Sequence, residues 1–218
     1  MNRRTFALGL AAAGVAGGAR AAGLPVPPSG RIGFRVLRNG VPIGEHHLKF
    51  TQDGAALNVE INADLVVKVL GVPVFHYTLQ ALERWEGQSF VGLDSQVNHN
   101  GARYEVHAAP VAGGFAVRST KAGDYVYTGQ RPMMPLTYWN KAMLEAEILN
   151  VETGRHYPAI VNSPGWNYLP TAEGGQIVAQ RFDVTGKLHL SVWYDQTSQW
   201  AGLAFSVDGH ETFEKITA

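Results

Sequence analysis

Alternation between apolar and polar residues over two long segments limits what this chain can fold into more than any other feature of its sequence. In residues 55–69 every odd position is apolar, while most even positions are polar or charged. Residues 74–86 repeat the pattern, with one apolar face made of Phe75, Tyr77, Leu79, Ala81 and Trp85. A period of two indicates a β-strand with one face on a core and the other on water, which is typical of antiparallel sheets.

Turn-forming pairs divide the rest of the chain at strand-length intervals, among them Asn39-Gly40, Asn100-Gly101 and Asp208-Gly209. Such pairs accept the positive φ angles that tight hairpins require. Long twisted strands also make a sheet coil. We therefore expect an all-β fold, in which a curved antiparallel meander sheet forms a half-barrel or an open barrel.

One segment, residues 135–144, departs from the alternation. Leu136, Trp139, Ala142 and Met143 are spaced as they would be on one face of a helix. We expect a single short helix over this segment, which acts as a lid or a plug for the curved sheet.

The first 21 residues resemble a twin-arginine export signal. Arg3 and Arg4 precede a short run rich in Ala, Gly and Leu, and Ala19-Arg20-Ala21 has the form of a cleavage site. The run is shorter than the about 20 residues that a membrane span needs. We expect cleavage after about Ala21, an extended tether at 22–30, and a single β domain at 31–217 without a membrane span.

This signal predicts a periplasmic protein, whose precursor meets the twin-arginine export machinery and a signal peptidase. An alternative stays open, because the ordinary secretory route can also tolerate an arginine pair. Replacing both arginines with lysine would separate the two routes.

Composition excludes several classes of function. The chain has no cysteine, which rules out disulfides, thiolate zinc sites and Cys-ligated iron–sulfur clusters. Its formal net charge is zero and no basic stripe is visible, so we expect no nucleic-acid partner. The eight histidines lack the spacing of a metal site, and no nucleophile elbow is present, so we expect no metal and no cofactor.

A series of motifs resembles one known family. The series runs through Glu83-x-Trp85, Asn100-Gly101, Tyr138-Trp139-Asn140, Trp193-Tyr194-Asp195 and Asp208-Gly209. It is similar to the exported bacterial domain-of-unknown-function family numbered 6134, over about 31–217. The pattern is also similar, more distantly, to curved half-barrels of periplasmic lipoprotein and lipid carriers. That resemblance implies a bent sheet and a helical lid around an apolar cavity, while the family itself implies no activity.

The best-supported function is non-catalytic binding of a hydrophobic or amphipathic small molecule inside the sheet. The expected contact residues supply apolar surface or a polar anchor, and they are Tyr77, Leu79, Glu83, Trp85, Trp139 and Asn140. Glu83 falls on the apolar face, so it is either a buried anchor or a rim residue beside Arg84. Asn140 is either such an anchor or a cap that bonds the backbone.

Two other functions stay open. The first is an interaction module of the cell envelope, which would use exposed strand edges or a surface made of Trp193, Asp195 and Trp200. The second is an enzyme of unrecognised type, which would need acids or histidines that converge only in the folded protein.

Overall fold

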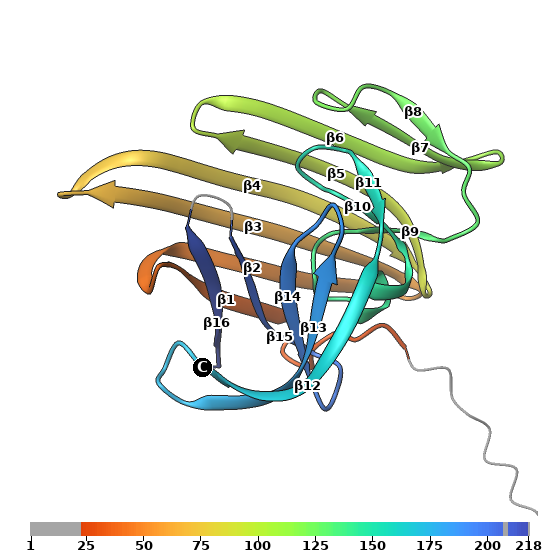
Figure 1. Ribbon diagram of the computed structural model, residues 1–218. Coiled ribbons are helices and arrows are strands. Elements are labelled where there is room, and N and C mark those ends of the chain that lie inside the picture. The colour runs from red at the N-terminus through yellow and green to blue at the C-terminus, as the bar shows by residue number, and fades with distance from the viewer. Residues whose placement is uncertain (1–22, 207–208, 218) are drawn as a thin grey trace, which may run out of the picture.

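The computed structural model describes residues 23–206 and 209–217, and the expected export signal lies outside them. Thirteen strands form one antiparallel sheet in the order β12-β13-β14-β15-β16-β1-β2-β3-β4-β5-β6-β7-β8 (Figure 1). Their bounds are β1 Arg31–Arg38, β2 Val41–Asp53, β3 Ala56–Val69, β4 Val72–Glu86, β5 Ser89–His99, β6 Ala102–Val111, β7 Gly114–Ser119, β8 Tyr125–Tyr127, β12 Ile160–Pro170, β13 Gln176–Thr185, β14 Leu190–Asp195, β15 Trp200–Ser206 and β16 His210–Ile216.

The expected fold class is confirmed, because the sheet is antiparallel, curved and not closed. Strands β1 to β8 follow one another as a meander, and so do β12 to β16. Pairing of β16 with β1, from Gly33↔Ile216 to Arg38↔Glu211, joins the two meanders into one sheet. Strands β12 and β8 are left as its two edges.

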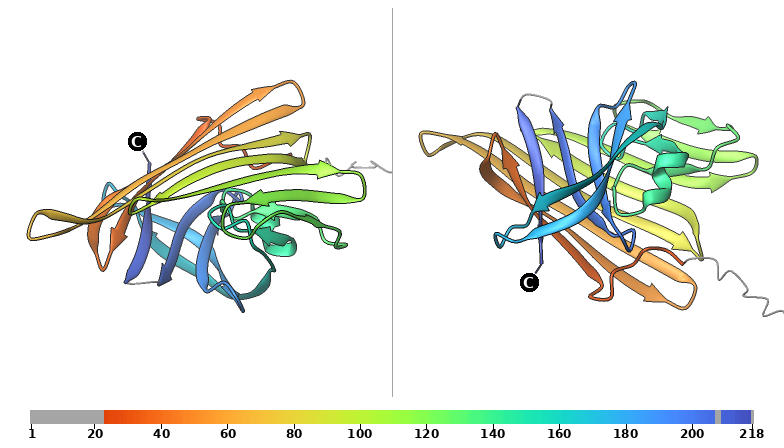
Figure 2. Two further views of the ribbon diagram at one scale, coloured as in Figure 1. Left: turned by 90° about the horizontal axis from the view of Figure 1, so that it is seen from above. Right: turned by 60° about the horizontal axis from the view of Figure 1, so that its bottom comes forward.

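The sheet folds over on itself into two layers. Seen from above, β2 to β7 form one layer and β12 to β15 lie beneath it, with the strands of the two layers crossing steeply (Figure 2, left). The alternation in 55–69 explains this, because Leu57, Val59, Ile61 and Ala63 are buried between the layers while their even-numbered neighbours are exposed. In Figure 1, the β3–β4 hairpin extends beyond its neighbours at the end opposite Trp85.

A bulge interrupts the pairing of β2 with β1. The pairing of β1 with β2 shifts register between Val36 and Leu37, opposite Gly44. Gly44 has a φ of 150°, and a Cβ atom there would overlap the Asp64 carbonyl oxygen of β3. Only glycine allows this close approach, so the bulge depends on it.

The segment between the meanders forms a second, smaller sheet of order β11-β10-β9. Its strands are β9 Met133–Pro135, β10 Glu147–Leu149 and β11 His156–Pro158, and η1 Lys141–Glu145 is a five-residue 3-10 helix between β9 and β10. The right-hand view of Figure 2 shows η1 at one end of the molecule, beside the small sheet.

The expected helix over 135–144 is wrong in its bounds. Pro135 belongs to β9, and Tyr138 has a φ of 69°, which no right-handed helix contains. Asn140 is the N-cap of η1, so helical structure starts only after it. The apolar residues are buried as expected at Leu136, Trp139 and Met143, although Ala142 is exposed.

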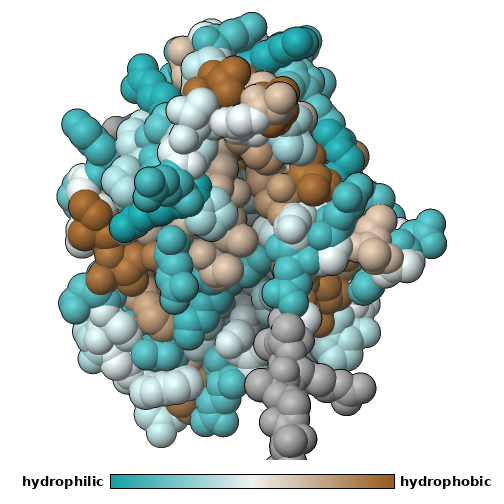
Figure 3. All heavy atoms as spheres, turned by 90° about the vertical axis from the view of Figure 1, so that its right-hand side faces the viewer, coloured by the Kyte–Doolittle hydropathy of each residue, from teal (hydrophilic) through white to brown (hydrophobic). Residues whose placement is uncertain are grey.

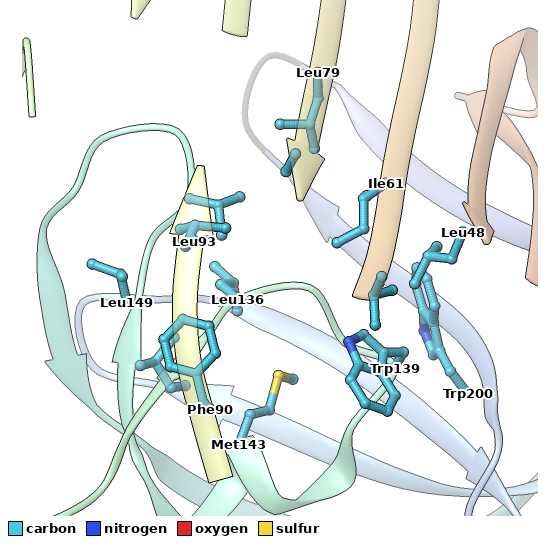
Figure 4. Close-up of a cluster of buried hydrophobic side chains, with 14 of the residues drawn as sticks. Leu48, Ile61, Leu79, Phe90, Leu93, Leu136, Trp139, Met143, Leu149 and Trp200 are labelled. Carbon is cyan, nitrogen blue, oxygen red and sulfur yellow. The ribbon is translucent and has the colours of Figure 1, made fainter. Parts of the chain in front are cut away.

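The core fills the space between the layers at the end where this segment lies. In Figure 4, Phe90, Leu93, Leu136, Met143 and Leu149 gather on one side, while Leu48, Ile61, Trp139 and Trp200 gather on the other. No helix in the described part of the chain is long and apolar enough to cross a membrane.

Candidate functional site

The half-barrel is packed with side chains at one end and hollow at the other. A cavity of about 540 Å³ opens beside the β3–β4 hairpin. One wall comes from the inner faces of β2, β3 and β4, and the facing wall from β14, β15 and β16. Leu136, Thr137 and Tyr138 form its floor together with residues 150–152. This volume lies within the range of small-molecule sites.

The walls of the cavity are mainly apolar. Three adjacent cross-strand pairs line the sheet side, namely Ala63↔Leu79, Leu65↔Tyr77 and Val67↔Phe75. Leu190, Leu203, Phe205 and Phe213 line the opposite side. The inward face of the alternating segments therefore supplies the apolar surface, as the sequence predicts.

A plug, which we define as residues 136–145, closes the other end of the half-barrel. Its Trp139 is fully buried and packs edge-on against Trp85, with ring centroids 5.3 Å apart, and against Phe50 at 5.2 Å. Because Leu136 to Tyr138 directly precede Trp139, the plug also sets the position of the cavity floor.

Glu83 binds the plug to the sheet. Its Oε2 atom accepts the indole N–H of Trp85 and that of Trp139, each at 2.9 Å. Glu83 is completely buried, so the alternative that placed it at the rim beside Arg84 is wrong. Arg84 instead pairs with Asp94 on the outer face.

Burial governs the ionisation of Glu83. It raises the pKa of the carboxyl to about 7, and hydrogen bonding by Thr137, Trp139 and Trp85 opposes part of the rise. The Oε1 atom is buried without a hydrogen-bond partner of good geometry. The two indole N–H groups are therefore the groups that hold the Glu83 carboxyl in place.

Of the residues expected to contact a ligand, Tyr77 and Leu79 line the cavity. Glu83, Trp85, Trp139 and Asn140 lie in the packed end, outside the lining. Asn140 Oδ1 accepts the backbone N–H of Ala142 at 3.1 Å, which is the capping role that the sequence left open. The polar anchor expected from Glu83 is thus an anchor for the plug.

The surface expected from Trp193, Asp195 and Trp200 is wrong. Trp200 is fully buried in the main core, with its ring 4.1 Å from that of Phe34. Trp193 is 9% exposed, because β12 covers the outer face there and Asn167 accepts its indole N–H at 3.2 Å. Asp195 shapes the β14–β15 turn, where its Oδ1 accepts the N–H groups of Thr197 and Gln199.

Sequence reasoning missed the polar residues of the cavity. Tyr138 and Glu152 lie at its floor, while Arg38 and Glu211 form a pair on its wall with 3.7 Å between Nε and Oε1. His46 also lines the cavity, and burial lowers its pKa to about 3, with a smaller contribution from His47. Period-two alternation marks His46 as inward-facing, but no signal in the sequence brings Tyr138 and Glu152 next to Tyr77.

Metal-binding groups and exposed apolar patches are the other features that could mark a site. Within residues 23–206 and 209–217, no three His, Asp or Glu side chains gather closely enough to hold a metal ion. Figure 3 looks at the plugged end of the molecule, where hydrophobic residues show as small separate patches among hydrophilic ones. The cavity is therefore the best candidate for a functional site.

Comparison with known proteins agrees with this architecture. A solved structure, the beta-barrel-like protein of domain of unknown function DUF1849 from Brucella abortus, is similar with a TM-score of 0.59 and 9% sequence identity. The similarity covers 86% of this chain and 95% of the other, and at this identity it shows the fold alone. No curated protein matches the sequence. The profile of the domain of unknown function DUF6134 matches residues 34–216, so the chain belongs to the DUF6134 family.

Proposed function

We propose that this protein binds a hydrophobic or amphipathic small molecule in the cavity, without catalysis, after export to the periplasm. The observation that carries the proposal is a cavity of about 540 Å³ with apolar walls from two layers of one sheet. Burial of apolar ligand surface contributes about 25 cal/mol per Å² before the costs of binding. The twin-arginine-like start of the sequence supports the compartment.

The arrangement favours a binding function because the floor of the cavity is fixed by the fold. Trp139 and Glu83 hold the plug against the sheet, so residues 136–138 are already in position in the structure without a ligand. A preformed site avoids the cost of ordering a loop on binding. Glu83, whose pKa is raised, accepts hydrogen bonds from two indole groups. These bonds favour a structural role for Glu83 over a catalytic one.

A cavity-filling variant tests the proposal. Leu65 lines the cavity, and Leu65→Trp would fill the space between the walls. Asn62→Trp is the matched control, because Asn62 lies on the same strand with its side chain exposed on the outer face. Binding of the neutral apolar fluorophore N-phenylnaphthylamine should be lost in Leu65→Trp and retained in Asn62→Trp.

Native mass spectrometry of protein purified from a bacterial periplasm complements this test. We expect a co-purifying amphipathic molecule on the wild-type protein and on Asn62→Trp, and none on Leu65→Trp. Equal fluorophore binding by all three proteins would show that the cavity is not the site and would overturn the proposal.

A second candidate is a protein-interaction module, and edge strand β12 is the observation that favours it. Trp166 is 52% exposed and Tyr168 is 73% exposed on this strand, which pairs only with β13 in the sheet. An exposed edge can accept a strand from a partner. Loss of a partner on replacing Trp166 and Tyr168 with serine, with fluorophore binding unchanged, would favour this function.

A further inference from the structure

Two tyrosine hydroxyls at the cavity floor have no hydrogen-bond partner among residues 23–206 and 209–217. Tyr77 reaches the cavity from β4 and Tyr138 from the plug. Neither hydroxyl bonds to any described residue, and each keeps some accessible surface. Tyrosine hydroxyls in largely apolar surroundings usually find a partner. Both hydroxyls are therefore available to a molecule in the cavity.

Glu152 is the third polar group at this place. It lines the cavity, and its charge raises the pKa of both Tyr77 and Tyr138, second in each case to their burial. Tyr138 contributes further to the raised pKa of Tyr77. All three side chains line the same cavity, and we call Tyr77, Tyr138 and Glu152 the floor cluster.

Tyr138 is held in place by the fold at a cost in backbone energy. Its φ of 69° is unfavourable for a residue with a bulky side chain. Its carbonyl oxygen accepts the hydroxyl of Tyr194 at 2.7 Å, and its ring lies 5.3 Å from that of Trp200. Strained residues of this kind persist where their surroundings fix them, and they are concentrated at binding sites.

We propose that the floor cluster binds the polar head of an amphipathic ligand, and that this head is a neutral hydroxyl or amide group. The proposal rests on the proposed function and names the class of ligand for the same cavity. Its apolar tail would then extend toward the open end, along the walls formed by Leu65, Val67 and Phe75.

The hydrogen-bonding groups of the floor cluster determine which polar head it would bind. Two phenol groups donate hydrogen bonds, while the Glu152 carboxylate accepts them. A hydroxyl or primary amide offers both an acceptor and a donor, so it can satisfy all three residues. A carboxylate or phosphate head would instead meet the negative charge of Glu152, and an ammonium head has no acceptor for the tyrosine hydroxyls.

The only cation paired with the floor cluster, among the described residues, does not change this preference. Lys121 Nζ lies 3.9 Å from Glu152 Oε1 and 4.3 Å from the centre of the Tyr104 ring. Lys121 is not part of the cavity lining. Lys121 would therefore give an anionic head at the floor no direct partner, and the cations of the lining, Arg38 and Lys187, belong to the walls.

Competition among ligands of one chain length tests the proposal. Lauryl alcohol, lauramide, laurate and laurylamine would each displace N-phenylnaphthylamine from the wild-type protein. We expect the alcohol and the amide to bind at least about tenfold more tightly than laurate or laurylamine. Tyr77→Phe and Tyr138→Phe should each weaken lauramide about 3- to 10-fold, which is the effect of one lost hydrogen bond.

The controls separate this inference from the proposed function. Tyr168→Phe, on the exposed edge strand, should leave every affinity unchanged. The fluorophore affinity of each cavity variant is measured first and is used to convert its competition data into ligand affinities. Glu152→Gln should narrow the difference between lauramide and laurate. Fluorophore binding with laurate as the tightest ligand, or with no effect of either tyrosine change, would overturn the inference and leave the proposed function intact. Absence of fluorophore binding would overturn both.

Discussion

Trp139 donates its indole N–H to Glu83 across 56 residues of sequence, with 2.9 Å between Nε1 and Oε2. The same oxygen accepts the indole N–H of Trp85, so one carboxylate oxygen joins the plug to strand β4. Since Tyr138 directly precedes Trp139, this contact also sets the position of the cavity floor. Stability and ligand binding should therefore depend on the same bond.

Replacing Trp139 with alanine should destabilise the protein by about 3–5 kcal/mol. The change removes a completely buried ring from between Trp85 and Phe50 and leaves a void in the packed end. Urea denaturation measures the change in the free energy of unfolding. Trp166→Ala is the matched control, because Trp166 is 52% exposed and should change stability by less than about 0.5 kcal/mol.

Comparison of the wild-type protein with Glu83→Gln should show that the Glu83 carboxyl is protonated more readily in the folded state than in the unfolded state. Its pKa is about 7 when folded and 4.5 when unfolded, so the stability it contributes is complete below pH 4.5 and is lost as the pH rises through 7. Relative to Glu83→Gln, the wild-type protein should lose about 1.4 kcal/mol per pH unit across this interval. Urea denaturation of both proteins at a series of pH values measures the difference.

Glutamine is the suitable replacement because its amide oxygen can still accept both indole N–H groups. A stability difference between the two proteins that stays constant from pH 4.5 to pH 7 would show that Glu83 is not the titrating group. A difference that grows in the opposite direction would mean that burial does not raise this pKa.

The contribution of His46 to stability should change with pH in the opposite direction. Burial lowers its pKa from 6.5 to about 3, so its contribution to stability is complete above pH 6.5 and is lost as the pH falls through 3. His46→Phe should therefore resist acid better than the wild-type protein, by about 1.4 kcal/mol per pH unit in that interval.

The pKa values of Glu83 and His46 together also predict how the free energy of unfolding of the wild-type protein varies with pH. Between pH 4.5 and 6.5 the slopes from Glu83 and His46 oppose each other, so their combined effect should be small. Acid denaturation followed by tryptophan fluorescence would detect it as a plateau. In Glu83→Gln the plateau should become a slope, with stability rising as the pH rises.

Local periodicity predicted the half-barrel because the strands themselves carry the signal. In β4 every inward residue from Leu79 to Trp85 is buried, and even Glu83 keeps its place on that face. The plug was predicted as a helix because spacing alone reports which residues are buried. It does not report that Pro135 pairs with β10 or that Tyr138 adopts a positive φ.

The prediction of an exposed surface at Trp193, Asp195 and Trp200 was wrong for a different physical reason. Alternation in β14 correctly places Trp193 on the face opposite Val192, but β12 returns to cover that face with Leu169 and Asn167. Contacts between strands so far apart in sequence leave no local pattern. For the same reason the meeting of Tyr77, Tyr138 and Glu152 at the cavity floor required the folded structure.

The Leu70→Asn variant should be more stable than the wild-type protein. Leu70 and Gly71, at the tip of the β3–β4 hairpin, have φ angles of 51° and 82°, close to the 53° and 95° of Asn100 and Gly101. A leucine in this conformation destabilises the fold by about 1 kcal/mol or more, whereas an asparagine tolerates the positive φ. Leu70 is also 99% exposed, so its side chain gains no stability from burial.

The reciprocal change, Asn100→Leu, places a leucine in the same turn conformation one hairpin away. Thermal unfolding should show a gain of about 1 kcal/mol for Leu70→Asn and a loss of similar size for Asn100→Leu. A loss of stability in Leu70→Asn would mean that Leu70 makes contacts that support the hairpin. A gain would show that backbone conformation, and not a contact of the leucine side chain, decides stability at this turn.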